Sequence, residues 1–435
     1  MTTTTTGGRP PRPRTPTPAG AARLADRLAQ WETPATSYYL LLGATLLLVV
    51  FGLVMVLSSS SVTAMAAGGS AFSVVARQAL FAAIGLPLMF AASRVTVATW
   101  KRLAWPALAL AVFGQLLVFT PLGKNVNGNT NWIEVAGFTA QPSEAAKWAL
   151  VLWCAAVLSR KVSLLDRWKH VVVPVAPLAG LLIGMVMLGH DLGTAVIMMV
   201  VVGVMLFVAG APLRLFGIGA LAAGAVATLM VLSSENRVRR IQSWFSGECV
   251  DQFGSCWQSQ HGTWALASGG WWGLGLGASR EKWSWLPAAH NDFIYAIIGE
   301  ELGLPGTLVV LALFVTLSVA FVRVVRRHDD PFVKIATAGV LAWVVGQALA
   351  NVAVVLGLVP VVGVPLPLVS SGGSALVSTL LALGMVMSFA RAEPGADEAL
   401  TARAAVVRHS LAVVGARASA ARGTAPAYRR SRPRR

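Results

Sequence analysis

An acidic and a basic residue stand together at the start of an apolar segment. In QPSEAAKWALVLWCAAVL, Glu144 and Lys147 are three residues apart, so on a helix they share a face and can form an ion pair. Pro142 and Ser143 are explained by ordinary helix-start chemistry, but the two charged residues are not. Ionisable side chains that enter an apolar segment of membrane length are costly and often functional. We therefore take Glu144 and Lys147 as candidate site residues.

A second candidate is a carboxylate at the point where a Trp-rich segment, residues 244–285, meets another apolar run. In LPAAHNDFIYAIIGEELG, Asp292 follows His290 and precedes the apolar run. A carboxylate at the mouth of a membrane cavity can act as a general base. Asp is also a common N-cap residue, and the spacing alone favours a cap over catalysis.

Three arginines, Arg237, Arg239 and Arg240, precede the same Trp-rich segment. Guanidinium groups bind phosphate oxygens through paired hydrogen bonds, so the cluster could hold an anionic ligand such as a diphosphate. Binding of lipid headgroups is an equally good interpretation of these residues.

The last candidate segment is GLVPVVGVPLPLVSSGGSAL, residues 357–376, which lies between two apolar runs. Its prolines and glycines cannot continue a regular helix. Non-helical backbone at membrane depth has to line a cavity, unless the segment lies outside the membrane. No Walker A loop, HExxH, GxSxG or metal-spaced Cys/His set occurs, whereas a metal held by Asp or Glu remains open.

Membrane-spanning helices must position these candidates. Only 12% of the 435 residues are charged and 56% are hydrophobic, which is typical of a membrane protein rather than a water-soluble one. The net charge of +17 could indicate nucleic-acid binding, but basic residues also keep membrane-protein loops in the cytoplasm, and we prefer that interpretation. Ten apolar stretches approach the roughly 20 residues that a span needs: 38–57, 74–93, 103–122, 144–159, 170–188, 192–210, 214–232, 292–322, 335–358 and 373–390.

The distribution of basic residues predicts the topology. With the N-terminus inside, 27 of the 35 Lys and Arg fall in cytoplasmic segments, as the positive-inside rule requires. We therefore expect an all-α polytopic membrane protein with both termini cytoplasmic. Its membrane domain would cover residues 37–391, between basic tails at 1–36 and 392–435.

A long external segment, residues 233–291, joins the seventh and eighth stretches and contains seven Trp. We expect an ordered re-entrant platform, with an interfacial aromatic belt as the alternative. Cys249 and Cys256 lie in this segment, where an oxidising exterior favours a disulfide worth about 2–3 kcal/mol; two free thiols are the alternative. Cys154, inside a span, is expected to pack as a small apolar residue.

Five motifs resemble the SEDS family, the shape, elongation, division and sporulation glycosyltransferases of bacterial walls. They occur in the family's order and spacing, and the resemblance covers residues 38–391. The N-terminal run at 36–62 is more similar to division members than to elongation members, and the basic tails suggest an actinobacterial source. The motifs are PSEAAKW (142–148), DLGTA (191–195), RVRRI (237–241), GGWWGLGLGASREKWSWLPAAHNDFIYAIIGEELG (269–303) and GLVPVVGVPLPLVSSGGSA (357–375).

The resemblance implies a ten-span fold that polymerises lipid II, the undecaprenyl-diphosphate-linked disaccharide peptide, at the outer face of the cytoplasmic membrane. It also implies a class B penicillin-binding protein as transpeptidase partner, other division proteins, a place at the division septum and no nucleic acid. Asp292 falls on the essential loop aspartate of the family. The family's polar cavity positions fall on Glu144, Lys147, Arg237, Arg240 and Lys282, and its late-loop motif falls on Ser370, Gly372, Gly373 and Ser374. His290, at the entry to the eighth stretch, is a further candidate for substrate binding.

Four positions depart from the family pattern. Asn131 stands where an Arg is usual, which removes one possible phosphate contact. Ser371, Asn291 and His190 replace a Tyr, a Thr and a Pro. None of these changes affects Asp292, so the resemblance still implies the activity.

The residues suggest a mechanism in which external cations hold the diphosphate leaving group and stabilise its developing charge. Asp292 takes the proton from the attacking GlcNAc 4-hydroxyl, which adds to the anomeric carbon of lipid-linked MurNAc with inversion. We expect no tightly bound cofactor, although a divalent cation, Mg²⁺ or Mn²⁺, could assist through carboxylate oxygens. The alternatives are a lipid II flippase or other transporter, a non-catalytic division scaffold, and an elongation-type polymerase.

Overall fold

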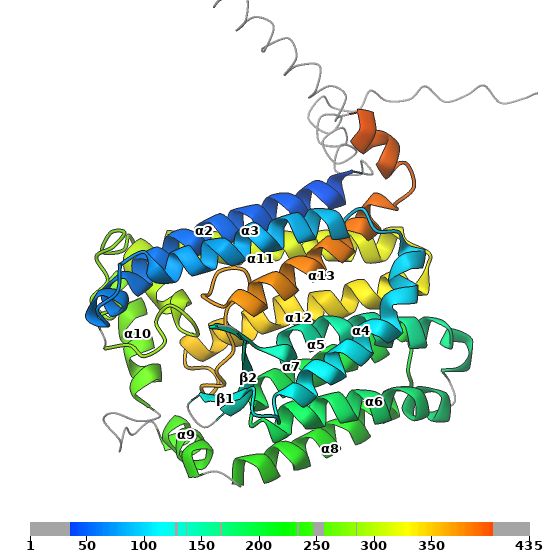
Figure 1. The fold of residues 1–435 in the computed structure, drawn as a ribbon, viewed down its shortest axis with the longest axis horizontal. Helices are drawn as coiled ribbons and strands as arrows, with labels where there is room; N and C mark the ends of the chain where they lie inside the picture. The colour runs from blue at the N-terminus through cyan, green and yellow to red at the C-terminus, as the bar shows by residue number, and fades with distance from the viewer. Residues whose placement is uncertain are drawn as a thin grey trace, which may run out of the picture.

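The computed structural model describes residues 35–126, 129–135, 137–165, 168–232, 235–246, 256–283 and 285–402. Long helices run roughly alongside one another and form the body of the molecule (Figure 1). The prediction of an all-helical polytopic membrane fold is confirmed. Each of the ten predicted stretches forms a long helix: α2 (Thr36–Ala66), α3 (Ser73–Ala92), α4 (Val97–Leu117), α5 (Pro142–Ser159), α6 (Trp168–Leu188), α7 (Leu192–Ala209), α8 (Leu213–Leu232), α11 (Ile294–Arg327), α12 (Pro331–Val355) and α13 (Gly373–Arg391).

Eight of these helices are long and apolar enough to cross a membrane on length and composition alone. The other two, α4 and α5, have similar lengths but carry charged pairs, Lys101–Arg102 and Glu144–Lys147, which lower their hydropathy. Both are packed into the bundle, and α5 is buried along most of its length. Its charged residues are therefore inside the protein rather than facing lipid.

A small antiparallel sheet, absent from the sequence-based prediction, precedes α5. Its strands are β1 (Gly123–Val126), β2 (Asn129–Val135) and β3 (Phe138–Ala140), in the order β1-β2-β3. The strands are too short to show a clear alternation of apolar and polar residues. The sheet lies at the same end of the bundle as the start of α5 (Figure 1).

The segment between α8 and α11 contains two further helices, α9 (Glu235–Ser246) and α10 (Trp257–Gly269), and α10 packs against α11. The described part of this segment is therefore ordered, as predicted. A 3₁₀ turn, Val162–Leu164, lies between α5 and α6.

The helix α11 is broken near its start. Gly303 has a non-helical backbone with φ of 63°. The break leaves carbonyls of the first turns without helical donors, and backbone N–H groups of the GGWWGLG run (269–275) take the place of those donors. Leu274 N donates to Glu300 O and Gly275 N donates to Glu301 O, both at 2.9 Å. The Trp-rich segment is thereby attached to α11 through its backbone.

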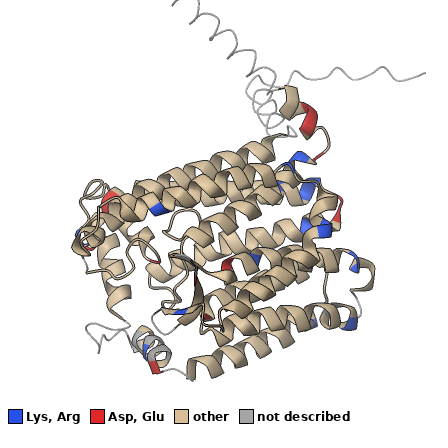
Figure 2. Ribbon diagram, in the orientation of Figure 1, with Lys and Arg blue, Asp and Glu red and all other residues tan. Residues whose placement is uncertain are grey.

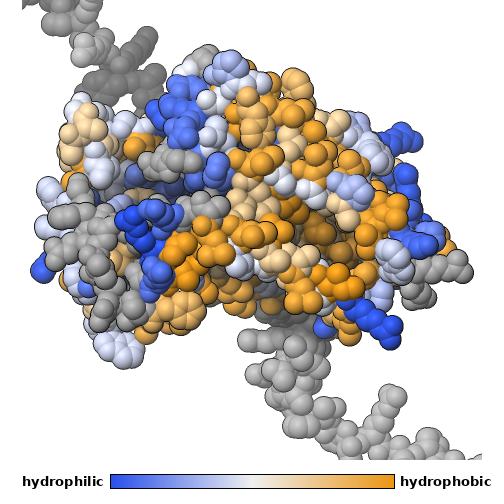
Figure 3. All heavy atoms as spheres, turned by 90° about the horizontal axis from the view of Figure 1, so that it is seen from below, coloured by the Kyte–Doolittle hydropathy of each residue, from blue (hydrophilic) through white to orange (hydrophobic). Residues whose placement is uncertain are grey.

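Charge and hydropathy divide the molecule along its long axis. Basic residues gather at the end opposite α9 and α10 (Figure 2), where both ends of the described chain also lie (Figure 1). Apolar side chains cover much of the surface between the two ends (Figure 3). This is the surface expected of a multi-pass membrane protein.

Candidate active site

Asp292 lies one residue before the N-cap of α11. The N-cap is Phe293, whose side chain makes no cap hydrogen bond, so the prediction that Asp292 occupies the cap is not supported. Its main-chain oxygen accepts a hydrogen bond of 2.7 Å from Asn351 Nδ2. A Cβ built on Gly363 would be 3.7 Å from Asp292 Oδ2, which places the carboxylate beside the backbone of the Pro- and Gly-rich segment.

We call residues 357–372 the late loop; they join α12 to α13. The late loop donates hydrogen bonds to the main-chain oxygens of the two residues before Asp292. Ser371 N donates to His290 O at 3.0 Å, and Ser370 Oγ donates to Asn291 O at 2.7 Å. The late loop and the segment that carries Asp292 are therefore held together by hydrogen bonds.

The predicted late-loop residues have structural partners. Ser370 Oγ also accepts from Leu366 N at 2.8 Å, and Gly372 N donates to Gln78 Oε1 at 3.1 Å. Gly373 faces the ring of Phe81 so closely that a Cβ would lie 2.2 Å from it. Ser374 Oγ accepts from Gln141 N at 3.3 Å. These residues join α3, α5 and α13 around the late loop.

Glu144 and Lys147 form the ion pair that their spacing predicted. Lys147 Nζ lies 2.9 Å from Glu144 Oε1, and the side chains of Lys147 and Glu144 are 1% and 3% exposed. Lys147 Nζ also donates to Gln347 Oε1 at 2.9 Å and lies over the ring of Trp343. Glu144 Oε2 is buried without a hydrogen-bond partner among the described residues. The ammonium group is thus held by protein contacts, and its part in substrate binding stays a prediction.

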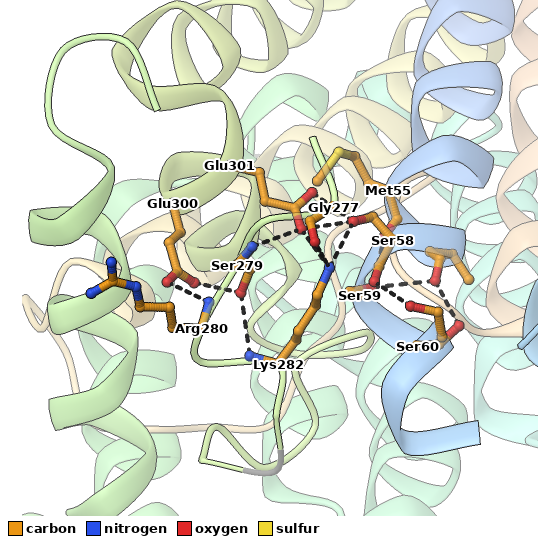
Figure 4. Close-up of polar contacts among 12 residues, drawn as sticks. Met55, Ser58, Ser59, Ser60, Gly277, Ser279, Arg280, Lys282, Glu300 and Glu301 are labelled. Carbon is orange, nitrogen blue, oxygen red and sulfur yellow. Dashed lines mark hydrogen bonds and ion pairs between the residues drawn. The ribbon is translucent and has the colours of Figure 1, made fainter. Parts of the chain in front are cut away.

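Lys282 belongs to a separate buried cluster (Figure 4). Its Nζ lies 3.1 Å from Glu301 Oε1 and 2.6 Å from the carbonyl of Gly277. Ser58 of α2 donates to the same Glu301 carboxylate at 2.6 Å, and Ser279 bonds to Glu300. Lys282 therefore joins the Trp-rich segment to α11 and α2, and its role in substrate binding stays a prediction.

Arg237 and Arg240 lie on α9, at the same end of the molecule as the small sheet. Their side chains are outside the described part of the structure, as is Cys249. Cys256 is disulfide-bonded, and Cys154 is a free, fully buried cysteine, as expected. The pairing of Cys249 with Cys256 and the diphosphate contacts of the arginines remain predictions.

His290 lines a pocket of about 240 Å³ together with Arg77 and Gln78 of α3 and Ser371. Burial lowers the pKa of His290, which favours the neutral imidazole at neutral pH. The pocket therefore offers one cation, Arg77, and several neutral polar groups beside the segment that carries Asp292.

The described residues contain no group of three or more His, Cys, Asp or Glu side chains arranged to hold a metal ion.

Sequence reasoning missed three buried amide side chains near the site: Gln78, Gln347 and Asn351, which are 4%, 2% and 1% exposed. Amides inside membrane helices are a detectable signal, because buried polar groups need partners. Asp191 caps α7 by accepting from Thr194 N at 2.9 Å, and its carboxylate also accepts from Gln141 Nε2 at 2.9 Å.

The site can support proton transfer. It combines the Asp292 residue, whose main chain is held by Asn351, with the polar pocket that His290 lines. The buried Glu144–Lys147 pair joins this arrangement through Gln347. Together, the helical membrane fold and this arrangement define a polytopic membrane protein with a candidate active site at one end of its bundle.

The chain belongs to the FtsW/RodA/SpoVE family of cell cycle proteins, also called the SEDS family; the sequence model of that family matches residues 38–394. The family resemblance of the sequence is thereby confirmed. The chain is 38% identical to the probable peptidoglycan glycosyltransferase FtsW of Mycobacterium tuberculosis over 88% of its length, covering 73% of that protein. It is 35% identical to stage V sporulation protein E of Bacillus subtilis, covering 81% of this chain and 96% of that one.

Solved structures show the same fold. A chain from a peptidoglycan synthase complex, described as coordinating polymerization and crosslinking, matches with a TM-score of 0.65 and 25% identity, over 81% of this chain and 96% of that one. The rod shape determining protein RodA of Thermus thermophilus matches with a TM-score of 0.60 and 23% identity, over 82% and 97% of the two chains.

Proposed function

We propose that this protein is a peptidoglycan glycosyltransferase that polymerises lipid II at the outer face of the cytoplasmic membrane during cell division, with Asp292 as the general base. The relatives named FtsW support the reaction class and the division role. The observation that carries the role of Asp292 is its placement: its carboxylate lies beside Gly363, and its backbone is fixed by Asn351.

The reaction is balanced without a covalent enzyme intermediate. The GlcNAc 4-hydroxyl oxygen of one lipid II bonds to the anomeric carbon of lipid-linked MurNAc on another chain. The bond from that carbon to the diphosphate breaks with inversion, and undecaprenyl diphosphate leaves. Asp292 accepts the hydroxyl proton, while Arg237 and Arg240 stabilise the negative charge on the leaving group.

The proposed partner is a class B penicillin-binding protein that crosslinks the new strands. Support comes from the structural match to a chain of a peptidoglycan synthase complex. We also propose that a divalent cation, Mg²⁺ or Mn²⁺, binds together with the substrate. Polymerisation measured with each ion and with EDTA tests whether the reaction needs it.

Incubation of the purified protein and its transpeptidase partner with lipid II tests the activity. We expect glycan ladders on gels from the parent. Asp292→Asn should remain folded and bind the partner, but its rate should fall by about 10² to 10⁴-fold, because the amide cannot take up the proton. Thermal stability of the variant is measured alongside the rate.

Asp191→Asn is the matched control. It makes the same chemical change at another helix start, where the carboxylate serves as a cap. Asn caps as well as Asp does, so this variant should retain the parent rate within about threefold. Glycan synthesis by Asp292→Asn at a similar level would remove Asp292 from the chemistry, and movement of labelled lipid II without glycan by the parent would favour the flippase.

A further inference from the structure

Two amide side chains on α12 lie between the Asp292 segment and the Glu144–Lys147 ion pair. Gln347 and Asn351 are four residues apart, so they share one face of the helix. They are 2% and 1% exposed. A buried amide in a membrane bundle is unfavourable unless its polar atoms are bonded, so their partners indicate why they are there.

Asn351 connects two segments that are distant in the sequence. Its Nδ2 donates to the main-chain oxygen of Asp292 at 2.7 Å and to that of Val364 at 2.8 Å. Both hydrogens of the amide are thus used. Because the bond goes to the backbone of Asp292, it fixes the position of that residue without occupying its carboxylate.

Gln347 extends the connection by one helical turn. Its Nε2 donates to Pro365 O at 2.8 Å, and its Oε1 accepts from Lys147 Nζ at 2.9 Å. Pro365 and Pro367 prevent regular helix in the late loop, so its carbonyls have no helical donors. The two amides of α12 supply the donors that this irregular backbone needs inside the protein.

We infer that Asn351 and Gln347 are positioning residues for Asp292. Asn351 joins the base-carrying segment to the late loop, and Gln347 joins the late loop to the Glu144–Lys147 pair. The inference rests on the proposed role of Asp292 as general base. A displacement of about 1 Å at a catalytic group can cost about 10²-fold in rate, so the loss of these bonds should appear in kcat more than in KM.

The test compares Asn351→Ala with Thr337→Val, using the full chain with its transpeptidase partner and lipid II. Thr337 lies on the same helix, is 0% exposed, and its hydroxyl has no hydrogen-bond partner among the described residues. We expect kcat of Asn351→Ala to fall by about 10 to 100-fold with KM for lipid II within about threefold of the parent. Thr337→Val should leave both constants unchanged.

A second variant separates the donor contact of Gln347 from its acceptor contacts, which include a bond of 3.2 Å from Trp343 Nε1 to Oε1. Gln347→Glu keeps an acceptor for Lys147 and nearly the same volume, but it removes the donor to Pro365 O. We expect a smaller fall in kcat, again without a change in KM. Hydrogen–deuterium exchange of peptides covering 288–293 and 364–372 should rise in both variants, while exchange in α7 and α13 stays at the parent level.

The outcomes are distinguishable from failure of the proposed function. If the parent makes no glycan, the glycosyltransferase proposal fails, but the exchange data still decide whether the amides fix the Asp292 segment. Parent-like kcat and exchange in Asn351→Ala would overturn the inference, as would a change in KM alone. If both amide variants unfold while Thr337→Val folds, the amides serve the fold in general and the inference is also overturned.

Discussion

At the scale of single residues, the Asp292 carboxylate lies beside a backbone turn that favours glycine. Gly363 has φ of 74°, and a Cβ there would be 3.7 Å from Asp292 Oδ2, an ordinary contact distance. The consequence of an added methyl group is therefore backbone strain rather than a clash. Strain at this turn should be transmitted to the position of the carboxylate.

Gly363→Ala should lower the free energy of unfolding by about 1–2 kcal/mol and reduce kcat about tenfold or more. Gly357→Ala is the matched control, because its φ of 72° is similar and a Cβ there would meet Thr263 rather than Asp292. We expect comparable loss of thermal stability in both variants, with parent-like kcat only in Gly357→Ala. Equal kcat values in the two would show that the turn at Gly363 does not position the base.

His290 predicts a pH dependence of stability. Burial lowers the pKa of this imidazole below its usual value of 6.5, so the folded state favours the neutral form. Its contribution to stability is present above pH 6.5 and is lost as the pH falls through that value toward the folded pKa. Thermal unfolding of the parent should therefore shift down between pH 7.5 and 5.5, and His290→Gln should show a smaller shift. Identical shifts would mean that His290 is not the titrating group.

At the scale of elements, the Trp-rich segment, α11 and α2 are joined by the cluster in Figure 4. Lys282, Glu301 and Ser58 are buried, and their contacts cross three separate segments. Removal of one member of a buried ion pair leaves the other charge uncompensated, which costs about 3–5 kcal/mol. The cluster therefore holds the Trp-rich segment against α11 and α2.

Lys282→Met should lower the thermal stability of the protein while KM for lipid II stays near the parent value, because the ammonium group bonds to protein atoms. The double variant Lys282→Met/Glu301→Gln should recover part of the lost stability, since no uncompensated charge remains. Unfolding curves and lipid II titrations measure the two effects. A raised KM for lipid II with unchanged thermal stability would show that Lys282 binds the substrate.

At the scale of the whole molecule, the basic end in Figure 2 predicts the orientation in the membrane. Lys101 pairs with Asp330 at that end, and the adjacent Asp329 is exposed. The exposed Ala278 lies in the Trp-rich segment. The positive-inside rule predicts that the basic end is cytoplasmic.

Cysteine labelling of intact cells with a membrane-impermeant reagent checks the orientation. Ala278→Cys should be labelled, and Asp329→Cys should be labelled only after the membrane is permeabilised. The parent is the control, because Cys154 is fully buried and Cys256 is disulfide-bonded. Labelling of Asp329→Cys in intact cells would reverse the topology.

The sequence by itself determined the ten long helices and the family. A bilayer demands an apolar run of a certain length, so each span is visible locally. The i, i+3 spacing of Glu144 and Lys147 also determined their pairing, because helix geometry is local. Asp292 was found as a candidate, although its competing prediction as an N-cap was not supported by the structure.

Only the tertiary structure decided what each polar group bonds to. Ser58 and Glu301 are 243 positions apart, and Asn351 and Asp292 are 59 apart, so no local pattern pairs them. For this reason no pattern in the sequence predicted the partner of Lys282, whose ammonium group lies 3.1 Å from the buried Glu301 carboxylate. The short sheet was missed for the opposite reason, because strands of four, seven and three residues carry too little periodicity to be recognised before their pairing is known.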